Sequence, residues 1–295
     1  MFYNFLPNES GRTKFYNYIA ENFKEVDAGA LGKSILGSDI HYYKIGCGID
    51  AVISVGAHHG MEYITAEALY NVIGILLENL TRHATSYGVN IAFLLQKFTF
   101  WFIPCLNADG VDMVLSGVRN NPLRERQIRM NCGEDFSDWQ ANARGVDLNH
   151  NYAFRFFEYK KIEADENILP GKTRFSGEYP ESEPEVRALA NLVRVIRPQL
   201  ILSFHSQGEE VFFRPRNKRK VLRIAQSAAE LLGYSLSRPE GLADYGGLSD
   251  YAGEILGIPS LTVEVGKGKN PLPESQLSAI AERLYKLHVL LPTKL

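Results

Sequence analysis

Apolar, β-branched runs alternate with amphipathic stretches of helical period along this 295-residue chain, and no other feature limits its possible folds as strongly. Strands that alternate with helices are typical of an α/β domain with a largely parallel central sheet. We find no internal repeat or low-complexity linker, so residues 1–295 are predicted to form a single domain, with an N-terminal helix and strand (1–48) packed onto it. The predicted strands are 40–45, 51–55, 98–103, 200–204 and 259–265, and the predicted helices are 61–80, 184–195, 221–232 and 274–291, after a first helix capped by Ser10.

The charge balance argues against a protein that binds nucleic acid. The chain has 32 basic and 34 acidic side chains and a net charge of −2, whereas proteins that bind nucleic-acid phosphates usually carry a basic excess. Hydrophobic residues make up 45% and charged residues 22%, as in ordinary globular proteins. The longest apolar stretch, 98–106, is far shorter than the ~20 residues of a membrane-spanning helix. We therefore expect neither nucleic acid nor a membrane as a partner.

The predicted location is the cytoplasm. The first residues, MFYNFLPNES, do not show the basic segment followed by an apolar segment that marks a secretory signal. Three cysteines give no disulfide framework and fit a reducing compartment. We expect Cys47, Cys105 and Cys132 to be buried apolar thiols.

Two histidines and a glutamate follow two of the predicted strands. In open α/β sheets, sites gather beyond the carboxyl ends of the strands. His59 and Glu62 are three residues apart at a strand-to-helix turn and can share one face of the helix, and His205 ends another strand. Two histidines and one glutamate leave a fourth position for water, which is typical of a catalytic zinc site. His58 is the rival first ligand, but it continues the alternation of the strand, so we prefer His59.

An acidic residue interrupts the last predicted strand. Glu264 lies within Leu-Thr-Val-Glu-Val, where its burial would be costly unless it is paired or functional. A single His-x-x-Glu motif or a single histidine at a strand end is weak evidence for a metal site, since most such residues do not bind metal. The combination of these residues, each beyond a strand, favours a site.

Longer motifs surround these residues: His59-Gly60-Met61-Glu62, Pro104-x-x-Asn107-x-Asp109-Gly110, Gly145-Val146-Asp147-Leu148-Asn149, His205-Ser206, Gly246-Gly247-x-x-Asp250 and Thr262-Val263-Glu264. In this order they resemble the zinc carboxypeptidase (metallocarboxypeptidase) family over about residues 50–275. The resemblance implies a mixed sheet of about eight strands sandwiched by helices, and one Zn²⁺ per chain held by His59, Glu62 and His205. It also implies that Glu264 is the general base on the zinc-bound water, and that Arg144 stabilises the oxyanion.

The same resemblance assigns four residues to substrate binding. Asn149 would help to hold a substrate carboxylate. His150 replaces an arginine that anchors the terminal carboxylate in many members, and a histidine cannot reproduce that bidentate geometry. Tyr245 lies close to the place of a family tyrosine, which alignment puts at position 240 or 242, and can substitute for it. Ser249 occupies the position that sets side-chain preference.

Three segments resemble one branch of the family, the bacterial peptidases that cut γ-D-glutamyl–diamino-acid bonds in cell-wall peptides. They are 139–149, 205–209 and 259–273. The predicted substrate is therefore a small, muropeptide-like peptide. The basic segment 214–220 could bind a carboxylate of such a substrate, but we interpret it as a solvated loop.

Other classes fit less well. A phosphate loop ending in Gly32-Lys33-Ser34 would need a glycine at Asp27, and the sequence has no Gly-x-Ser-x-Gly elbow. An ordinary metallocarboxypeptidase that removes C-terminal amino acids and a zinc amino-acid deacylase are the alternative enzymes. The non-enzyme alternative, an inactive binding module of the same fold, predicts loss of a ligand or of the base, whereas all four candidates are present.

Overall fold

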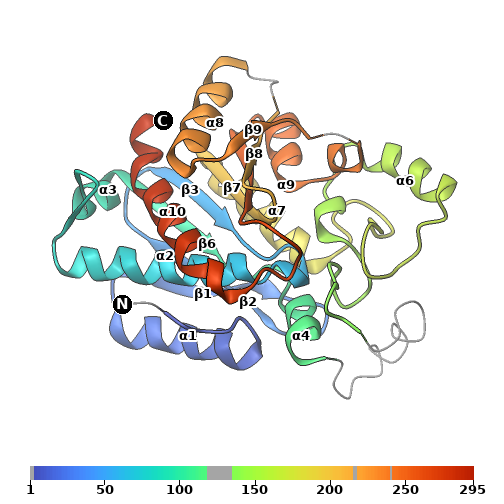
Figure 1. The fold of residues 1–295 in the computed structure, drawn as a ribbon, viewed down its shortest axis with the longest axis horizontal. Helices are drawn as coiled ribbons and strands as arrows, with labels where there is room; N and C mark the ends of the chain where they lie inside the picture. The colour runs from blue at the N-terminus through green and yellow to red at the C-terminus, as the bar shows by residue number, and fades with distance from the viewer. Residues whose placement is uncertain (1–2, 118–134, 215–217, 240) are drawn as a thin grey trace.

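The centre of the molecule is an eight-stranded mixed sheet with the order β1-β2-β6-β3-β7-β10-β8-β9 (Figure 1). The structure is a computed structural model that describes residues 3–117, 135–214, 218–239 and 241–295. The four central strands β6, β3, β7 and β10 run parallel to one another. The antiparallel pairs are β1 with β2, β2 with β6, and β8 with β10. The strands of the sheet are β1 (Asp27–Lys33), β2 (Asp39–Ile45), β3 (Asp50–Val55), β6 (Phe98–Ile103), β7 (Leu200–Ser206), β8 (Glu210–Phe212), β9 (Ser235–Ser237) and β10 (Ser260–Val265), and a separate hairpin pairs β4 (Thr85–Ser86) with β5 (Val89–Asn90).

Helices cover both faces of this sheet. Figure 1 shows α2 and α10 in front of the strands, with α1 below and α8 above them. The longer helices are α1 (Glu9–Asn22), α2 (Ile64–Thr81), α3 (Ile91–Lys97), α4 (Ala108–Ser116), α6 (Phe156–Asp165), α7 (Pro184–Ile196), α8 (Lys218–Leu232) and α10 (Leu277–Leu290). The short ones are η1 (Gly60–Glu62), η2 (Leu148–His150), η3 (Gly241–Asp244), α9 (Leu248–Asp250), the π-helical η4 (Tyr251–Ile255), η5 (Glu274–Gln276) and η6 (Pro292–Lys294).

Alternation along the central strands builds two cores. In β7, Leu202 and Phe204 join the core that contains buried residues of α1, α2, α8 and α10. Ile201 points to the opposite face and joins the core that contains α7, α9 and η4. A strand buried on both faces must be apolar almost throughout, which explains the continuous apolar runs of the sequence. The polar residues Ser203 and His205 share the face of Ile201, because side chains alternate along a strand.

The predicted α/β fold is confirmed, and each predicted strand and helix is present with its ends within a few residues of the prediction. The helix predicted from residue 61 begins as η1, and α2 starts only at Ile64. The predicted cap Ser10 is wrong, because Asn8 Oδ1 accepts a hydrogen bond from the Gly11 amide at 2.9 Å. Cys47 is exposed rather than buried, Cys105 is buried as expected, and Cys132 lies outside the described residues.

The topology brings the sequence motifs to one edge of the sheet. β3, β7 and β10 are consecutive parallel neighbours, so their carboxyl ends lie together. The segment after β3 carries His59, the end of β7 carries His205, and the end of β10 carries Glu264. Among the described residues, no helix is long and apolar enough to cross a membrane.

Candidate functional site

His59, Glu62 and His205 meet in one cluster beyond the ends of β3 and β7. Their candidate ligand atoms all lie within 4.8 Å of one another, and Glu62 and His205 are buried. Glu62 bridges the two imidazoles: its Oε1 lies 2.9 Å from His59 Nδ1, and its Oε2 lies 3.0 Å from His205 Nδ1. Two imidazole nitrogens and a carboxylate in one small volume form the donor set that suits zinc.

Each imidazole of the cluster is also held by its other ring nitrogen. His59 Nε2 lies 3.2 Å from Asp147 Oδ1, and His205 Nε2 lies 3.2 Å from Ser203 Oγ. Asp147 is itself fixed, because its carboxylate accepts hydrogen bonds from the backbone amides of Asn149 and Arg174. Such partners orient a metal-binding imidazole and leave its opposite nitrogen to face the ion. Both Nδ1 atoms are therefore aimed at a common point.

The charges of the cluster are strongly coupled. Burial disfavours ionisation of Glu62, but His59 and His205 outweigh this effect and lower the pKa of Glu62 to about 2. Burial likewise disfavours a charged His59, yet Glu62 and Asp147 raise the pKa of His59 well above its ordinary value. A cation that binds here would take the place of the proton that the His59 ring otherwise holds.

His58, the rival ligand, lies outside the cluster. Its buried Nε2 lies 3.1 Å from the Tyr152 hydroxyl, and its ring stacks on His205 with centroids 5.2 Å apart. Burial, together with His205 and His59, lowers the pKa of His58 well below its ordinary value, so the ring is neutral. Its ring therefore packs against the His205 ring and is not one of the clustered ligands.

Glu264 lies beside His205, because the parallel register pairs these two residues on β10 and β7. Paired residues of neighbouring parallel strands point to the same face, so the Glu264 carboxylate reaches the side of the sheet that carries the cluster. Burial and the nearby Glu62 carboxylate raise the pKa of Glu264 well above its ordinary value. Glu264 also lines a pocket of about 140 Å³ together with Asn149, Ser249 and Thr262. We call this pocket the side pocket.

Arg144 is engaged elsewhere. Its Nε donates to Glu183 Oε2 at 3.1 Å and its Nη2 donates to Glu183 Oε1 at 3.2 Å. The Arg144 side chain is 49% exposed. Among the described residues, its guanidinium hydrogen bonds are to Glu183 and Ser182, and neither residue belongs to the metal-ligand cluster.

The four residues assigned to substrate binding separate into two groups. Asn149 and Ser249 line the side pocket, where Ser249 Oγ accepts a hydrogen bond from Thr262 at 2.9 Å. His150 and Tyr245 do not line it and belong to an aromatic stack: the His150 ring lies 4.3 Å from that of Tyr159, and its Nδ1 donates to the Tyr245 carbonyl at 2.9 Å.

The interpretation of segment 214–220 as a solvated loop is wrong for its first residue. The Arg214 side chain is 16% exposed and forms ion pairs with Asp244 and Asp250. Arg219 and Lys220 are exposed at the start of α8, and residues 215–217 lie outside the described part of the chain. The supporting roles of Asp147 and Ser203 and the partners of Arg214 were not predicted from the sequence. Asp147 lies within the Gly145–Asn149 motif, which was the available signal.

Comparisons with known proteins agree with this geometry. A family model described as zinc carboxypeptidase matches residues 13–286. The γ-D-glutamyl-L-diamino acid endopeptidase 1 of Lysinibacillus sphaericus is 29% identical over 255 residues, which cover 85% of this chain and 63% of that protein. The chain therefore spans less than two thirds of the length of this relative.

Two solved structures share the fold. Bovine thrombin-activatable fibrinolysis inhibitor, solved with a tick carboxypeptidase inhibitor, superposes with a TM-score of 0.75 at 20% identity, covering 98% of each chain. Murein-tripeptide amidase from Escherichia coli O157 superposes with a TM-score of 0.53 at 20% identity, covering 88% of this chain and 91% of that one. At these identities the likeness establishes a common fold.

Proposed function

The chain belongs to the zinc carboxypeptidase family, and on this premise we propose that it is a zinc-dependent peptidase that hydrolyses γ-D-glutamyl–diamino-acid bonds in bacterial cell-wall peptides. The observation that carries the proposal is the convergence of His59, Glu62 and His205, with Glu264 beside them on the next strand. The Lysinibacillus relative bears the name of this activity, and the name of the murein-tripeptide amidase points to the same class of peptide.

One Zn²⁺ per chain is the proposed cofactor, held by His59 Nδ1, His205 Nδ1 and the Glu62 carboxylate. The donor set fits the ion, because both Nδ1 atoms face the same carboxylate while both Nε2 atoms already have partners. A zinc ion held here would polarise the scissile carbonyl and make the attacking water more acidic.

Glu264 is proposed as the general base and then the general acid. Its carboxylate would take a proton from the attacking water and return it to the leaving amine. Burial and the Glu62 carboxylate raise the pKa of Glu264, which makes its carboxylate a stronger base for this role. The position of Glu264 also suits this role, because it is paired in register with His205, one of the proposed zinc ligands.

Arg144 is proposed as the residue that meets the negative charge on the carbonyl oxygen. In this role the guanidinium would give up or share its two hydrogen bonds to Glu183. The Arg144 side chain is about half exposed, so part of it faces solvent.

Asn149 and Ser249 are proposed to contact the substrate, because both line the side pocket next to Glu264. A direct substrate contact of His150 or Tyr245 would need the aromatic stack with Tyr159 to open. We propose that residues 1–295 act as one catalytic domain. The cytoplasm is the proposed location, which the exposed free thiol of Cys47 supports.

A carboxypeptidase that removes ordinary C-terminal residues is the second candidate function, favoured by the shared fold with bovine thrombin-activatable fibrinolysis inhibitor, which was solved with a carboxypeptidase inhibitor bound. His150 opposes it, because an imidazole cannot pair with a terminal carboxylate as a guanidinium does. The deciding experiment is mass spectrometry of the products from L-Ala-γ-D-Glu-meso-diaminopimelate and from a peptide with C-terminal Phe. We expect release of diaminopimelate and slow release of Phe. Faster release of Phe would overturn the proposal, and no turnover of either peptide would favour a deacylase or an inactive binding module.

A further inference from the structure

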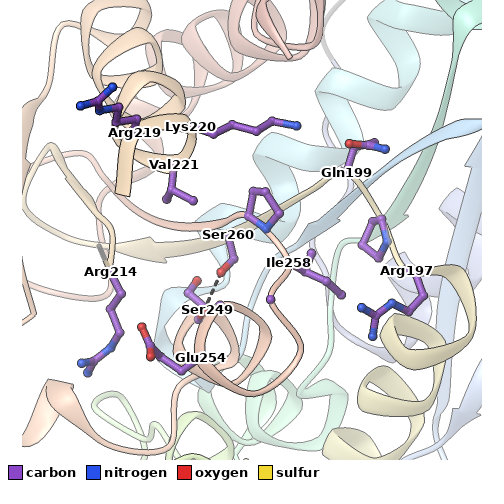
Figure 2. A pocket seen from close by; sticks show the side chains of 14 residues that line it. Arg197, Gln199, Arg214, Arg219, Lys220, Val221, Ser249, Glu254, Ile258 and Ser260 are labelled. Atoms are coloured by element: carbon purple, nitrogen blue, oxygen red, sulfur yellow. Dashed lines mark hydrogen bonds between the residues drawn. The ribbon is translucent and has the colours of Figure 1, made fainter. Parts of the chain in front are cut away.

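We propose that a basic cavity at the amino ends of β7 and β10 binds an organic dianion, a small molecule in which an apolar body joins two negatively charged groups. The cavity has a volume of about 590 Å³, which is within the usual range for small-molecule sites. The described residues that line it include Arg197, Arg214, Arg219 and Lys220 (Figure 2). We call it the basic cavity. This inference concerns a second site and does not depend on the proposed peptidase activity.

The basic cavity lies at the opposite end of the central strands from the metal-ligand cluster. Gln199 lines it just before β7, and Pro259 and Ser260 line it at the start of β10. Glu264, in contrast, lies near the carboxyl end of β10. At ~3.3 Å per residue, Ser260 is about 13 Å from Glu264 along this strand. A ligand in the basic cavity would therefore bind away from the bond that the peptidase is proposed to cleave.

Arg214 contributes little net charge to the basic cavity. It forms ion pairs with both Asp244 and Asp250, so its positive charge is already balanced. Figure 2 shows its side chain extending away from Arg219 and Lys220. The side pocket shares this arginine. Arg214 thus forms part of the wall between the two cavities, and the charge that could attract an anion comes from the other basic residues.

The other three basic residues lack an acidic partner. Within the ranges that the structure describes, Arg219 and Lys220 form no ion pair, and Arg197 Nη2 donates a hydrogen bond to the Leu256 carbonyl. Glu254 is the one acidic residue among the described lining residues, so these four side chains leave an excess of two positive charges. The whole chain has a net charge of −2, so the excess is a local feature. Charge complementarity then predicts a ligand with two negative charges.

The start of α8 adds to the positive potential. This 15-residue helix begins with Lys218, Arg219 and Lys220, and it has no acidic residue in its first turn. The backbone amides at the N-terminus of a helix carry a partial positive charge, so basic side chains there are unfavourable and an anion is favourable. A bound anion would offset both the side-chain charges and the partial charge of the helix end.

The shape of the basic cavity favours an extended ligand. Figure 2 shows Arg219 and Lys220 on one side of the cavity and Arg197 on the other, with Ile258 between them. Val221 and Ile258 also line the cavity, and both side chains are buried against the protein. A hydrocarbon body can cover these apolar side chains while the charged groups at its two ends meet basic residues on both sides. A compact anion would leave the apolar part of the cavity uncovered.

The test measures the binding of succinate, adipate and suberate to the zinc-loaded protein by isothermal titration calorimetry. Butyrate, hexanoate and octanoate are the controls, because they have the same lengths and a single carboxylate. We expect one dicarboxylate to bind about 10-fold more tightly than the monocarboxylate of its length, and to bind more weakly at high salt. Inorganic phosphate, which has no apolar body, should bind more weakly than this dicarboxylate. Equal affinities of each matched pair, or tighter binding of phosphate, would overturn the inference.

Variants of exposed residues then locate the site. Arg197→Gln and Lys220→Gln should each weaken binding of the preferred dicarboxylate by about 3- to 10-fold, whereas Arg197→Lys should retain most of the affinity. Arg223→Gln is the matched control, because Arg223 is exposed on the same helix and does not line the basic cavity. An affinity that is unchanged when Arg197→Gln and Lys220→Gln are combined would overturn this inference. Loss of the peptidase activity would refute only the proposed function, because these binding measurements do not depend on turnover.

Discussion

His59 and Asp147 form a hydrogen-bonded pair, with His59 Nε2 lying 3.2 Å from Asp147 Oδ1. The opposite nitrogen of the same ring faces Glu62 at 2.9 Å. Because the carboxylate of Asp147 is buried and also bound by backbone amides, it fixes both the orientation of the ring and the nitrogen that carries the proton. The position of the first metal ligand therefore depends on a residue 88 positions away in the chain.

Asp147→Asn should weaken zinc binding by about 10- to 100-fold, as is typical when the partner of a metal-binding histidine is lost. The measurement is competition for zinc with a chelator of known affinity. Asp138→Asn is the matched control, because Asp138 is an exposed acid paired with Lys172. Equal affinities of the Asp147→Asn variant and the unmodified protein would show that Asp147 does not support the metal ligand.

Glu264→Gln should keep the zinc and lose activity by about 10²- to 10⁴-fold, the usual contribution of a general base. Metal analysis and kcat on the diaminopimelate peptide test this together. Glu210→Gln is the control, since Glu210 lies opposite Glu264 on β8 and is outside the proposed machinery. Near-normal turnover by Glu264→Gln would remove Glu264 from the mechanism.

Arg144→Met should lower kcat by about 10²- to 10³-fold without loss of zinc, if its guanidinium meets the developing negative charge. Arg187→Met is the comparison, because Arg187 also donates to the Ser182 carbonyl near Glu183. A kcat within twofold of normal for Arg144→Met would limit Arg144 to its ion pair with Glu183.

His288 should make the protein less stable in mild acid. Its buried ring donates from Nδ1 to the Leu284 carbonyl and accepts from the Ser54 hydroxyl at Nε2, and burial lowers its pKa to about 4. In the unfolded chain the pKa of the His288 ring is higher, about 6.5, so this ring binds more protons there than in the folded protein. The free energy of unfolding is therefore not reduced by His288 above about pH 6.5. Below that pH it falls as the pH approaches 4, by about 2 kcal/mol between pH 8 and pH 5.

Urea unfolding of His288→Gln at these two pH values measures this contribution. The decrease in the free energy of unfolding should be smaller than in the unmodified protein by about 2 kcal/mol. His83→Gln, which changes an exposed histidine, should leave the decrease unchanged. An unaltered decrease in His288→Gln would show that His288 does not account for the acid sensitivity.

The pattern of apolar residues along the sequence predicted the strands and helices of this fold, because it shows which faces of each element are buried. The runs that became β6 and β7 are apolar since both faces of those strands are covered, and the rule for strand ends then placed His205 and Glu264 together. β1 was not predicted, because its residues, rich in glycine and alanine, form an edge strand with little apolar alternation.

Contacts between distant side chains were harder to predict. The ion pair of Arg214 with Asp250 spans 36 positions, and nothing in the local pattern of a basic segment distinguishes a paired arginine from a solvated one. The same holds for Arg144, whose placement just before a recognisable motif did not reveal its pairing with Glu183. Local sequence indicates which face of an element is buried, whereas the partner of a charge depends on the assembled fold.

The most direct test of the account is anomalous diffraction at the zinc absorption edge from crystals of the unmodified protein. We expect one strong peak per chain, about 2.0–2.2 Å from His59 Nδ1, His205 Nδ1 and a Glu62 oxygen. A zinc peak bound by other residues, or no peak at this cluster in protein shown to contain zinc, would contradict the central claim that these three side chains hold the metal.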